Sequence, residues 1–107
     1  ALRDKQVGRA LAAIHRKPEK DWSVASLAKE VGMSRSGFSA RFTDRVGESP
    51  KRYLTRWRMQ LARIQLQESP DSLVVLADHF GYQSEAAFSR AFKREFGVSP
   101  GSVRRAN

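Results

Sequence analysis

The side chains best suited to chemistry lie on one face of the segment from Ser84 to Phe96. A guanidinium such as that of Arg90 can donate two parallel hydrogen bonds to guanine, and a carboxylate such as that of Glu85 can accept one from the amine of cytosine. The same carboxylate would also stabilise the start of a helix, where the helix dipole is positive. These residue types indicate contacts to a nucleic acid, with Arg90 as the best single candidate for a guanine contact.

Such a face requires a helix, and the apolar residues of this segment predict one. Phe88, Phe92 and Phe96 recur every four residues and form an apolar stripe. Aromatic rings can stack on single-stranded bases. This stripe, however, is the only core available to the segment, so we expect it to pack inside the protein. Polar and small residues lie opposite the stripe or on its flanks: Glu85, Ala86, Ser89, Arg90, Lys93 and Arg94.

An earlier segment, Ser34 to Val46, has the same design with smaller side chains. Its stripe is Phe38, Phe42 and Val46. The opposite face and its flanks carry Arg35, Ser36, Gly37, Ser39, Ala40 and Thr43. The small residues on this face cannot make a bidentate base contact. Recognition by this helix would therefore depend on close backbone approach, methyl contacts and the shape of the DNA.

Both segments belong to an internal repeat. The stretch from Gly32 to Pro50 reads GMSRSGFSARFTDRVGESP, and the stretch from Gly81 to Pro100 reads GYQSEAAFSRAFKREFGVSP. Leu27-Ala28 before the first glycine returns as Leu76-Ala77 before the second. A repeat of this length indicates a repeated supersecondary unit. Each copy predicts helix, glycine turn, helix, which is the pattern of a helix-turn-helix.

The longest predicted helix begins at Ser49-Pro50 and runs to about Gln67. It has two apolar rows, one of Leu54, Trp57, Leu61 and Ile64, and one of Met59, Ala62 and Leu66. A helix with two apolar rows can contact two neighbours, so we interpret it as a strut of roughly 27 Å between the two copies. A strut of that length would let two recognition helices reach successive major grooves about 34 Å apart.

Four further helices complete an all-α fold of about seven helices. They are predicted over residues 3–17, ending at Pro18, over Val24 to Val31 after Ser23, over Leu73 to Phe80, and after Ser99-Pro100. No alternating pattern predicts a strand. We expect Trp22, beside a polar connector, to be half exposed. The predicted domains are 1–49 (first helix and first helix-turn-helix lobe), 50–67 (linker helix) and 68–107 (second lobe).

The composition favours a polyanionic partner and argues against several other classes. The 107 residues include 20 Lys and Arg against 11 Asp and Glu, a formal net charge of +9. With no cysteine, disulfides and thiolate metal sites are excluded, and we expect a cytoplasmic protein. His15 and His79 lie in different lobes, which argues against a metal site. No cofactor loop, no nucleophile with a base and no membrane span is found, so we expect neither an enzyme nor a membrane protein.

Phosphate contacts are predicted for the basic residues of both lobes and for the capped helix starts at Ser34 and Ser84. The candidates are Ser34, Arg35, Arg41, Arg45, Lys51, Arg52, Ser84, Lys93, Arg94, Arg104 and Arg105.

On these residues the chain resembles the DNA-binding domain of the AraC/XylS family of bacterial transcription regulators. The resemblance covers about Val7 to Arg105 and is most specific from Gly81 to Pro100, which closely matches the family signature over its second helix-turn-helix. The first copy, from Ala28 to Tyr53, is similar to the equivalent part of the family. The resemblance implies Arg35, Ser36, Ser39, Ala40, Glu85, Ala86, Ser89 and Arg90 as base-contacting positions.

The resemblance also implies partners. It implies a sequence-specific binder of promoter DNA, usually an activator, that contacts RNA polymerase. In many members this domain follows an effector-binding or dimerising domain, and a chain that opens at Ala1 directly on a helix fits that arrangement. An alternative stays open: a basic helical module that binds a protein such as a polymerase subunit without contacting DNA.

Overall fold

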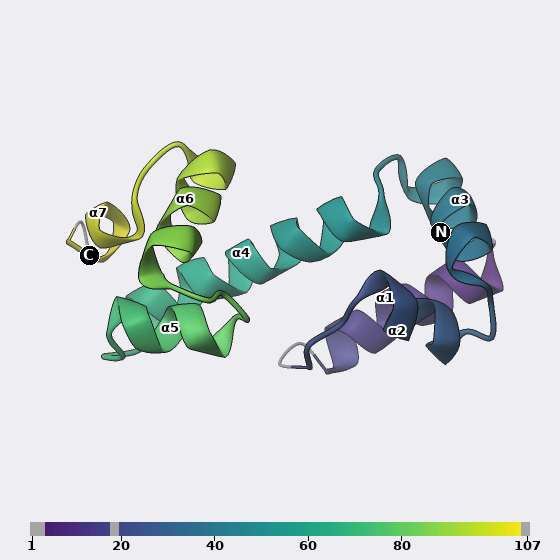
Figure 1. Ribbon diagram of the computed structural model, residues 1–107, viewed down its shortest axis with the longest axis horizontal. Coiled ribbons are helices and arrows are strands. Elements are labelled where there is room, and N and C mark those ends of the chain that lie inside the picture. The colour runs from purple at the N-terminus through teal and green to yellow at the C-terminus, as the bar shows by residue number, and fades with distance from the viewer. Residues whose placement is uncertain (1–3, 18–19, 106–107) are drawn as a thin grey trace. The chain divides into compact units, whose positions relative to one another are not determined.

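The fold is all-α, as the sequence predicts. The structure is a computed structural model that describes residues 4–17 and 20–105, and within these ranges it contains helices and no strand. The Arg3 end of the first predicted helix and its predicted stop at Pro18 lie outside the described residues. The helices are α1 (Lys5–Arg16), α2 (Val24–Glu30), α3 (Arg35–Val46), α4 (Pro50–Glu68), α5 (Leu73–His79), α6 (Glu85–Phe96) and α7 (Pro100–Arg105) (Figure 1).

Serine caps fix the starts of six of these helices. In each, a serine hydroxyl oxygen accepts a hydrogen bond from the backbone amide three residues later, at 3.0–3.2 Å; the serines are Ser23, Ser34, Ser49, Ser72, Ser84 and Ser99. Each such bond satisfies one of the amides that a helix leaves without an internal partner. The starts predicted at these serines are confirmed.

The described helices form two compact units, 1–55 and 56–107, and the boundary falls inside α4. The first unit contains α1, α2, α3 and the first turns of α4, and the second contains the rest of α4 with α5, α6 and α7. Each unit thus has one helix-turn-helix. The division of the chain at residues 49 and 67 remains a prediction.

The core of the first unit is built by three helices that contact one another (Figure 1). Val7 and Ile14 of α1, Leu27 of α2, and Phe38 and Phe42 of α3 are all fully buried. The predicted phenylalanine stripe of α3 is therefore core, and its opposite face is free for other contacts.

Trp22 was expected to be half exposed, and this expectation is wrong. Its side chain is buried, and its indole Nε1 donates a hydrogen bond to the carbonyl of Lys17 at 2.9 Å. The ammonium of Lys20 lies 4.3 Å from the ring centroid and covers the outer side. A partner for the indole N–H removes the main cost of burying a tryptophan.

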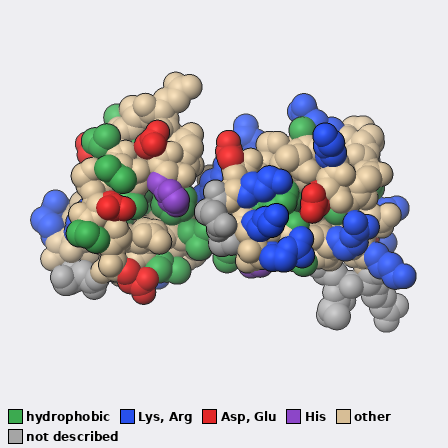
Figure 2. All heavy atoms as spheres, turned by 90° about the horizontal axis from the view of Figure 1, so that it is seen from below, with side chains coloured by type: hydrophobic (Ala, Val, Ile, Leu, Met, Phe, Trp, Pro, Cys, Tyr) green, Lys and Arg blue, Asp and Glu red, His purple; other side chains and the backbone are tan. Residues whose placement is uncertain are grey.

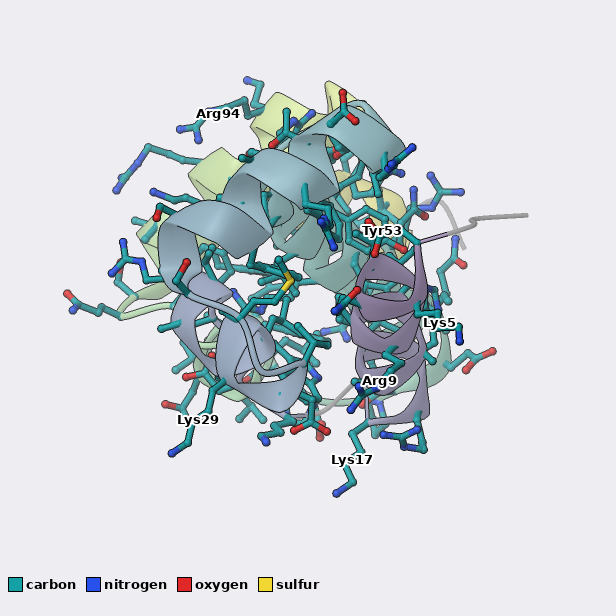
Figure 3. The ribbon with its side chains drawn as sticks, turned by 90° about the vertical axis from the view of Figure 1, so that its right-hand side faces the viewer. Lys5, Arg9, Lys17, Lys29, Tyr53 and Arg94 are labelled. Carbon is teal, nitrogen blue, oxygen red and sulfur yellow. The ribbon has the colours of Figure 1, made fainter. Side chains whose placement is uncertain are left out.

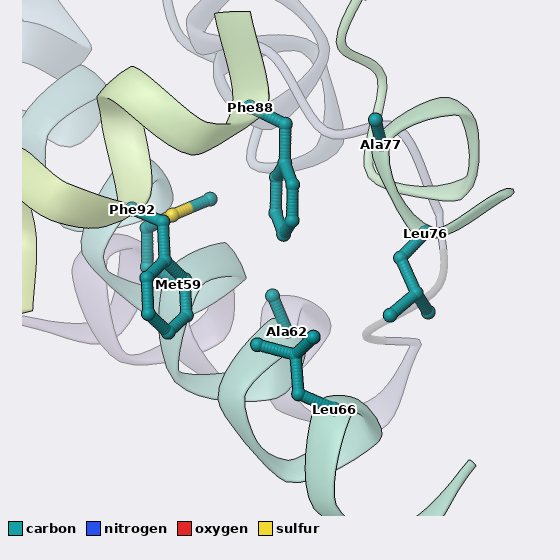
Figure 4. Close-up of a cluster of buried hydrophobic side chains, with 7 residues drawn as sticks. All are labelled: Met59, Ala62, Leu66, Leu76, Ala77, Phe88 and Phe92. Atoms are coloured by element: carbon teal, nitrogen blue, oxygen red, sulfur yellow. The ribbon is translucent and has the colours of Figure 1, made fainter. Parts of the chain in front are cut away.

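The core of the second unit lies between α4, α5 and α6 (Figure 4). Phe88 and Phe92 of α6 point into a cluster whose other members are Met59, Ala62, Leu66, Leu76 and Ala77. Met59, Ala62 and Leu66 are one of the two apolar rows predicted for α4. In the other row Ile64 is 47% exposed, so that part of the prediction is wrong. In this unit α5 and α6 cover the row of Met59, Ala62 and Leu66, whereas Ile64 lies outside the buried cluster.

Candidate nucleic-acid interface

The two helix-turn-helix motifs have the same tight turn. Gly32 and Gly81 have φ values of 70° and 84°, a left-handed conformation that glycine adopts without a steric penalty. The residue after each glycine donates its amide back to the preceding helix: Met33 to the carbonyl of Ala28, and Tyr82 to that of Ala77, both at 2.9 Å. Each turn thus ends the first helix and leads directly into the second.

The base-contacting residues predicted in the first copy share the outer part of α3. Arg35, Ser36 and Ala40 are exposed, while Ser39 is half-buried. The hydroxyl of Thr43 donates to the Ser39 carbonyl at 2.8 Å and so stays on the helix backbone. Apart from Arg35, the exposed residues of this face have short side chains.

The base-contacting residues predicted in the second copy lie in the same way on α6. Glu85, Ala86 and Arg90 are exposed, and Ser89 is half-buried. Neither Glu85 nor Arg90 forms an ion pair with any described residue. The guanidinium of Arg90 therefore keeps its donors for a ligand, as base recognition requires.

Arg41 and Arg45, predicted as phosphate contacts, meet at one carboxylate. Oδ2 of Asp4 lies 3.3 Å from Nε of Arg41 and 3.8 Å from Nε of Arg45. Oδ1 of Asp4 accepts the backbone amide of Val7 at 3.1 Å and caps α1. The Asp4 side chain is only 3% exposed, whereas those of the two arginines are 46% and 54% exposed. Asp4 was not among the predicted site residues; its position just before a helix was the available signal.

Arg104, also predicted as a phosphate contact, is engaged inside the second unit. Its Nε donates to the carbonyl of Leu66 at 3.2 Å, and its two Nη atoms donate to the carbonyls of Ser69 and Asp71. Leu66 and Ser69 lie at the C-terminal end of α4, where helix carbonyls lack partners and a positive charge is favourable. These contacts support a structural role; its role toward phosphate remains a prediction.

The other predicted phosphate contacts are exposed side chains: Arg35, Lys51, Arg52, Lys93, Arg94 and Arg105. The hydroxyls of Ser34 and Ser84 cap α3 and α6.

A further group of cations lies on α1 and at its C-cap, outside the predicted site. Lys5, Arg9 and Lys17 are exposed and point outward from the helix (Figure 3). Figure 2 shows Lys and Arg side chains gathered on one face of the first unit. Because Val7 and Ile14 turn one side of α1 toward the core of the unit, Lys5 and Arg9 lie on the opposite side of that helix. They add to the positive field of this unit.

Tyr82 lies in the turn between α5 and α6. Its ring lies 5.7 Å from that of Phe88, and burial raises the pKa of its phenol above the ordinary 10.0. Arg58 and Arg94 lower this pKa and Glu95 raises it, but burial is the largest effect.

Residues 4–17 and 20–105 include no helix that is both long and apolar enough to cross a membrane. The same residues contain no cluster of three or more His, Cys, Asp or Glu that could hold a metal ion.

Known proteins resemble this chain over nearly its whole length. A family model of the helix-turn-helix domain matches residues 27–106. A putative AraC-like transcription regulator of Streptomyces lividans is 47% identical over 97% of this chain, and the regulator AlkR of Acinetobacter baylyi is 47% identical over 94%. The chain covers 34% and 33% of these two proteins, so it spans about a third of their length.

Solved structures have the same fold. The C-terminal domain of AraT, a response regulator from Geobacillus stearothermophilus, matches with a TM-score of 0.87 and 30% identity, covering 97% of this chain and 87% of that domain. The DNA-binding domain of AdpA, solved in complex with a target DNA, matches with a TM-score of 0.85 and 28% identity, covering 96% of this chain and 93% of that one. With its two helix-turn-helix units and these relatives, the chain belongs to the AraC-type family of helix-turn-helix DNA-binding domains.

Proposed function

We propose that this chain binds double-stranded DNA in a sequence-specific manner and serves as the DNA-binding part of a transcription regulator. The observation that carries the proposal is the exposed polar face on the second helix of each helix-turn-helix, α3 and α6. The AdpA domain, which has this fold, was solved on its target DNA. The positive charge of the chain supplies the sequence-independent part of the affinity.

In this proposal the recognition helices α3 and α6 enter successive major grooves. Helix α4 has 19 residues, so it is about 28 Å long at about 1.5 Å per residue, compared with about 34 Å for one turn of B-DNA. Base contacts are assigned to Arg35, Ser36, Ser39, Ala40, Glu85, Ala86, Ser89 and Arg90. Of these, Arg90 is assigned the main direct contact to a guanine.

The wider role follows from the relatives and is part of the same proposal. Because the curated relatives are about three times as long, we propose that an effector-binding or dimerising domain accompanies this one in the full protein. The regulator would act in the cytoplasm, at promoters, as an activator in contact with RNA polymerase. Its activity would be binding, without catalysis or a cofactor.

Selection of bound sites from a random duplex pool tests the proposal. We expect a recurrent sequence, bound with a dissociation constant in the nanomolar to micromolar range, and an affinity that falls steeply with salt. A scrambled duplex of the same composition is the control. A pool that yields no recurrent sequence, with no gel retardation even at low salt, would favour the protein-binding alternative.

A further inference from the structure

The two carboxylate oxygens of Asp4 make different contacts. Oδ1 caps α1 through the amide of Val7, and Oδ2 faces the Nε atoms of Arg41 and Arg45 on α3. These arginines are four residues apart, so they lie on one side of the helix, one turn apart. The carboxylate thus joins the start of α1 to the flank of the first recognition helix.

The contact through Nε leaves the outer ends of both guanidinium groups available. One Nη of Arg41 donates weakly to Oε1 of Gln6 at 3.3 Å, and Nε of Arg45 also lies 3.9 Å from Oδ2 of Asp44, which is itself exposed. The remaining Nη groups have no partner among the described residues. Each guanidinium therefore has its Nε toward Asp4, while the two arginine side chains are 46% and 54% exposed.

An arginine that is already held loses less conformational entropy when it binds a ligand. Planar guanidinium groups with two free N–H donors match the oxygens of a phosphate. A buried carboxylate behind them could act in either of two ways: it could orient the pair for a phosphate, or it could neutralise the pair and weaken its attraction.

We propose that Asp4 is a positioning residue, which orients Arg41 and Arg45 as a phosphate clamp beside α3. The inference rests on the proposed DNA binding and adds to it a residue outside both helix-turn-helix motifs. In this arrangement the two guanidinium groups still attract a phosphate, because their Nε atoms face Asp4 and their Nη atoms meet the phosphate.

Removing the negative charge of Asp4 should then weaken DNA binding, whereas simple electrostatics would predict tighter binding. Asp4→Asn keeps the helix cap, since asparagine is as good an N-cap as aspartate, but it loses the ion pairs. Asp4→Glu keeps a carboxylate and makes a poorer cap. Glu30→Gln is the matched control: it makes the same change in net charge on α2, at an exposed residue without an ion pair to any described residue.

The experiment measures duplex affinity by fluorescence anisotropy across a salt series, and melting temperature by circular dichroism. The probes are the duplex selected from the random pool by the unchanged chain and a scrambled version of it. We expect Asp4→Asn to melt close to the unchanged chain, yet to bind both duplexes about three- to tenfold more weakly with a shallower salt dependence. Asp4→Glu should melt lower but bind nearly normally, and Glu30→Gln should bind no more weakly than the unchanged chain.

The double variant Arg41→Ala/Arg45→Ala supplies the decisive comparison. In that background Asp4→Asn should change the affinity by less than about twofold, because no clamp remains to be oriented. Equal or tighter binding by Asp4→Asn in the unchanged background would overturn the inference, as would an affinity loss that persists without the two arginines. Failure of the unchanged chain to bind any duplex would instead overturn the proposed function itself.

Discussion

A β-carbon built on Gly37 would lie 2.9 Å from the hydroxyl oxygen of Ser34. That oxygen caps α3 by accepting the amide of Gly37 at 3.1 Å. In the second copy Ala87 stands at the equivalent position and donates to Ser84 at 3.0 Å. The caps differ in backbone conformation, with φ of −67° at Ser34 and −152° at Ser84. The cap of α3 therefore favours glycine where that of α6 accepts alanine.

Gly37→Ala should consequently fail to stabilise the protein. The exchange gains about 1 kcal/mol of helix propensity in an ordinary helix interior. Here it also displaces the Ser34 hydroxyl, at a cost of about 1 kcal/mol, so the net change should be near zero. In a Ser34→Ala background the same exchange should be stabilising by about 1 kcal/mol. Urea unfolding of the four proteins measures this coupling; strictly additive effects would contradict it.

The helices were predictable because their signals are local. Phenylalanines at four-residue spacing and a serine before each start define α3 and α6 from the sequence alone. The expectations for Trp22 and Ile64 were wrong because neighbours distant in the chain, or backbone carbonyls, decide their exposure. The contacts of Arg104 join residues 33 to 38 positions apart, which no local pattern shows.

The predicted base and phosphate contacts, unlike the helices, do not follow from local sequence signals alone. Their exposure follows from the helix faces, whereas their contacts depend also on the sequence and shape of the DNA, which the protein sequence does not contain. Their assignment stays a prediction, and variants of exposed residues on α6 offer the sharpest test of it.

Arg90→Ala should weaken binding to the selected duplex and relax the preference at one base pair. Loss of a bidentate guanine contact costs about 1–3 kcal/mol against the preferred base and little against others. Lys93→Ala, on the same helix, is the matched control. It should weaken binding to all duplexes alike and reduce the salt slope by about 1. Affinity measured for each base at each position separates the two; an unchanged ratio of selected to scrambled affinity in Arg90→Ala would count against base recognition.

Arg104→Ala should destabilise the second unit. It removes three hydrogen bonds from a charged donor and leaves carbonyls at the end of α4 without this partner, at an expected cost of about 2 kcal/mol. Arg105→Ala, at an exposed neighbour, should change stability by less than about 0.5 kcal/mol. Urea unfolding followed by circular dichroism makes the comparison. If Arg104→Ala keeps full stability but loses DNA affinity, its main role is at phosphate.

Stability should depend on Tyr82 in alkaline solution. Its pKa in the folded protein lies above the unfolded value of 10.0, so the folded state holds the phenol proton more tightly. The resulting contribution to stability is complete below pH 10.0 and is lost as the pH rises through the raised pKa. Tyr82→Phe removes this dependence and leaves every other ionisable group of the chain in place. Above pH 10.0 the unfolding free energy of the unchanged chain should therefore fall relative to that of Tyr82→Phe. A difference between the two proteins that stays constant with pH would contradict this prediction.

The contacts of Arg104 also bear on the order in which the protein can fold as it is made. The first unit ends at residue 55, so its core is available while the rest is still being synthesised. The second unit receives the donor for the end of α4 only when Arg104 has left the ribosome. In a nascent chain that stalls before Arg104, the first unit would be folded. The carbonyls at the C-terminal end of α4 would still lack the hydrogen bonds from Arg104. Such a chain would be most sensitive to cellular proteases between α4 and α5.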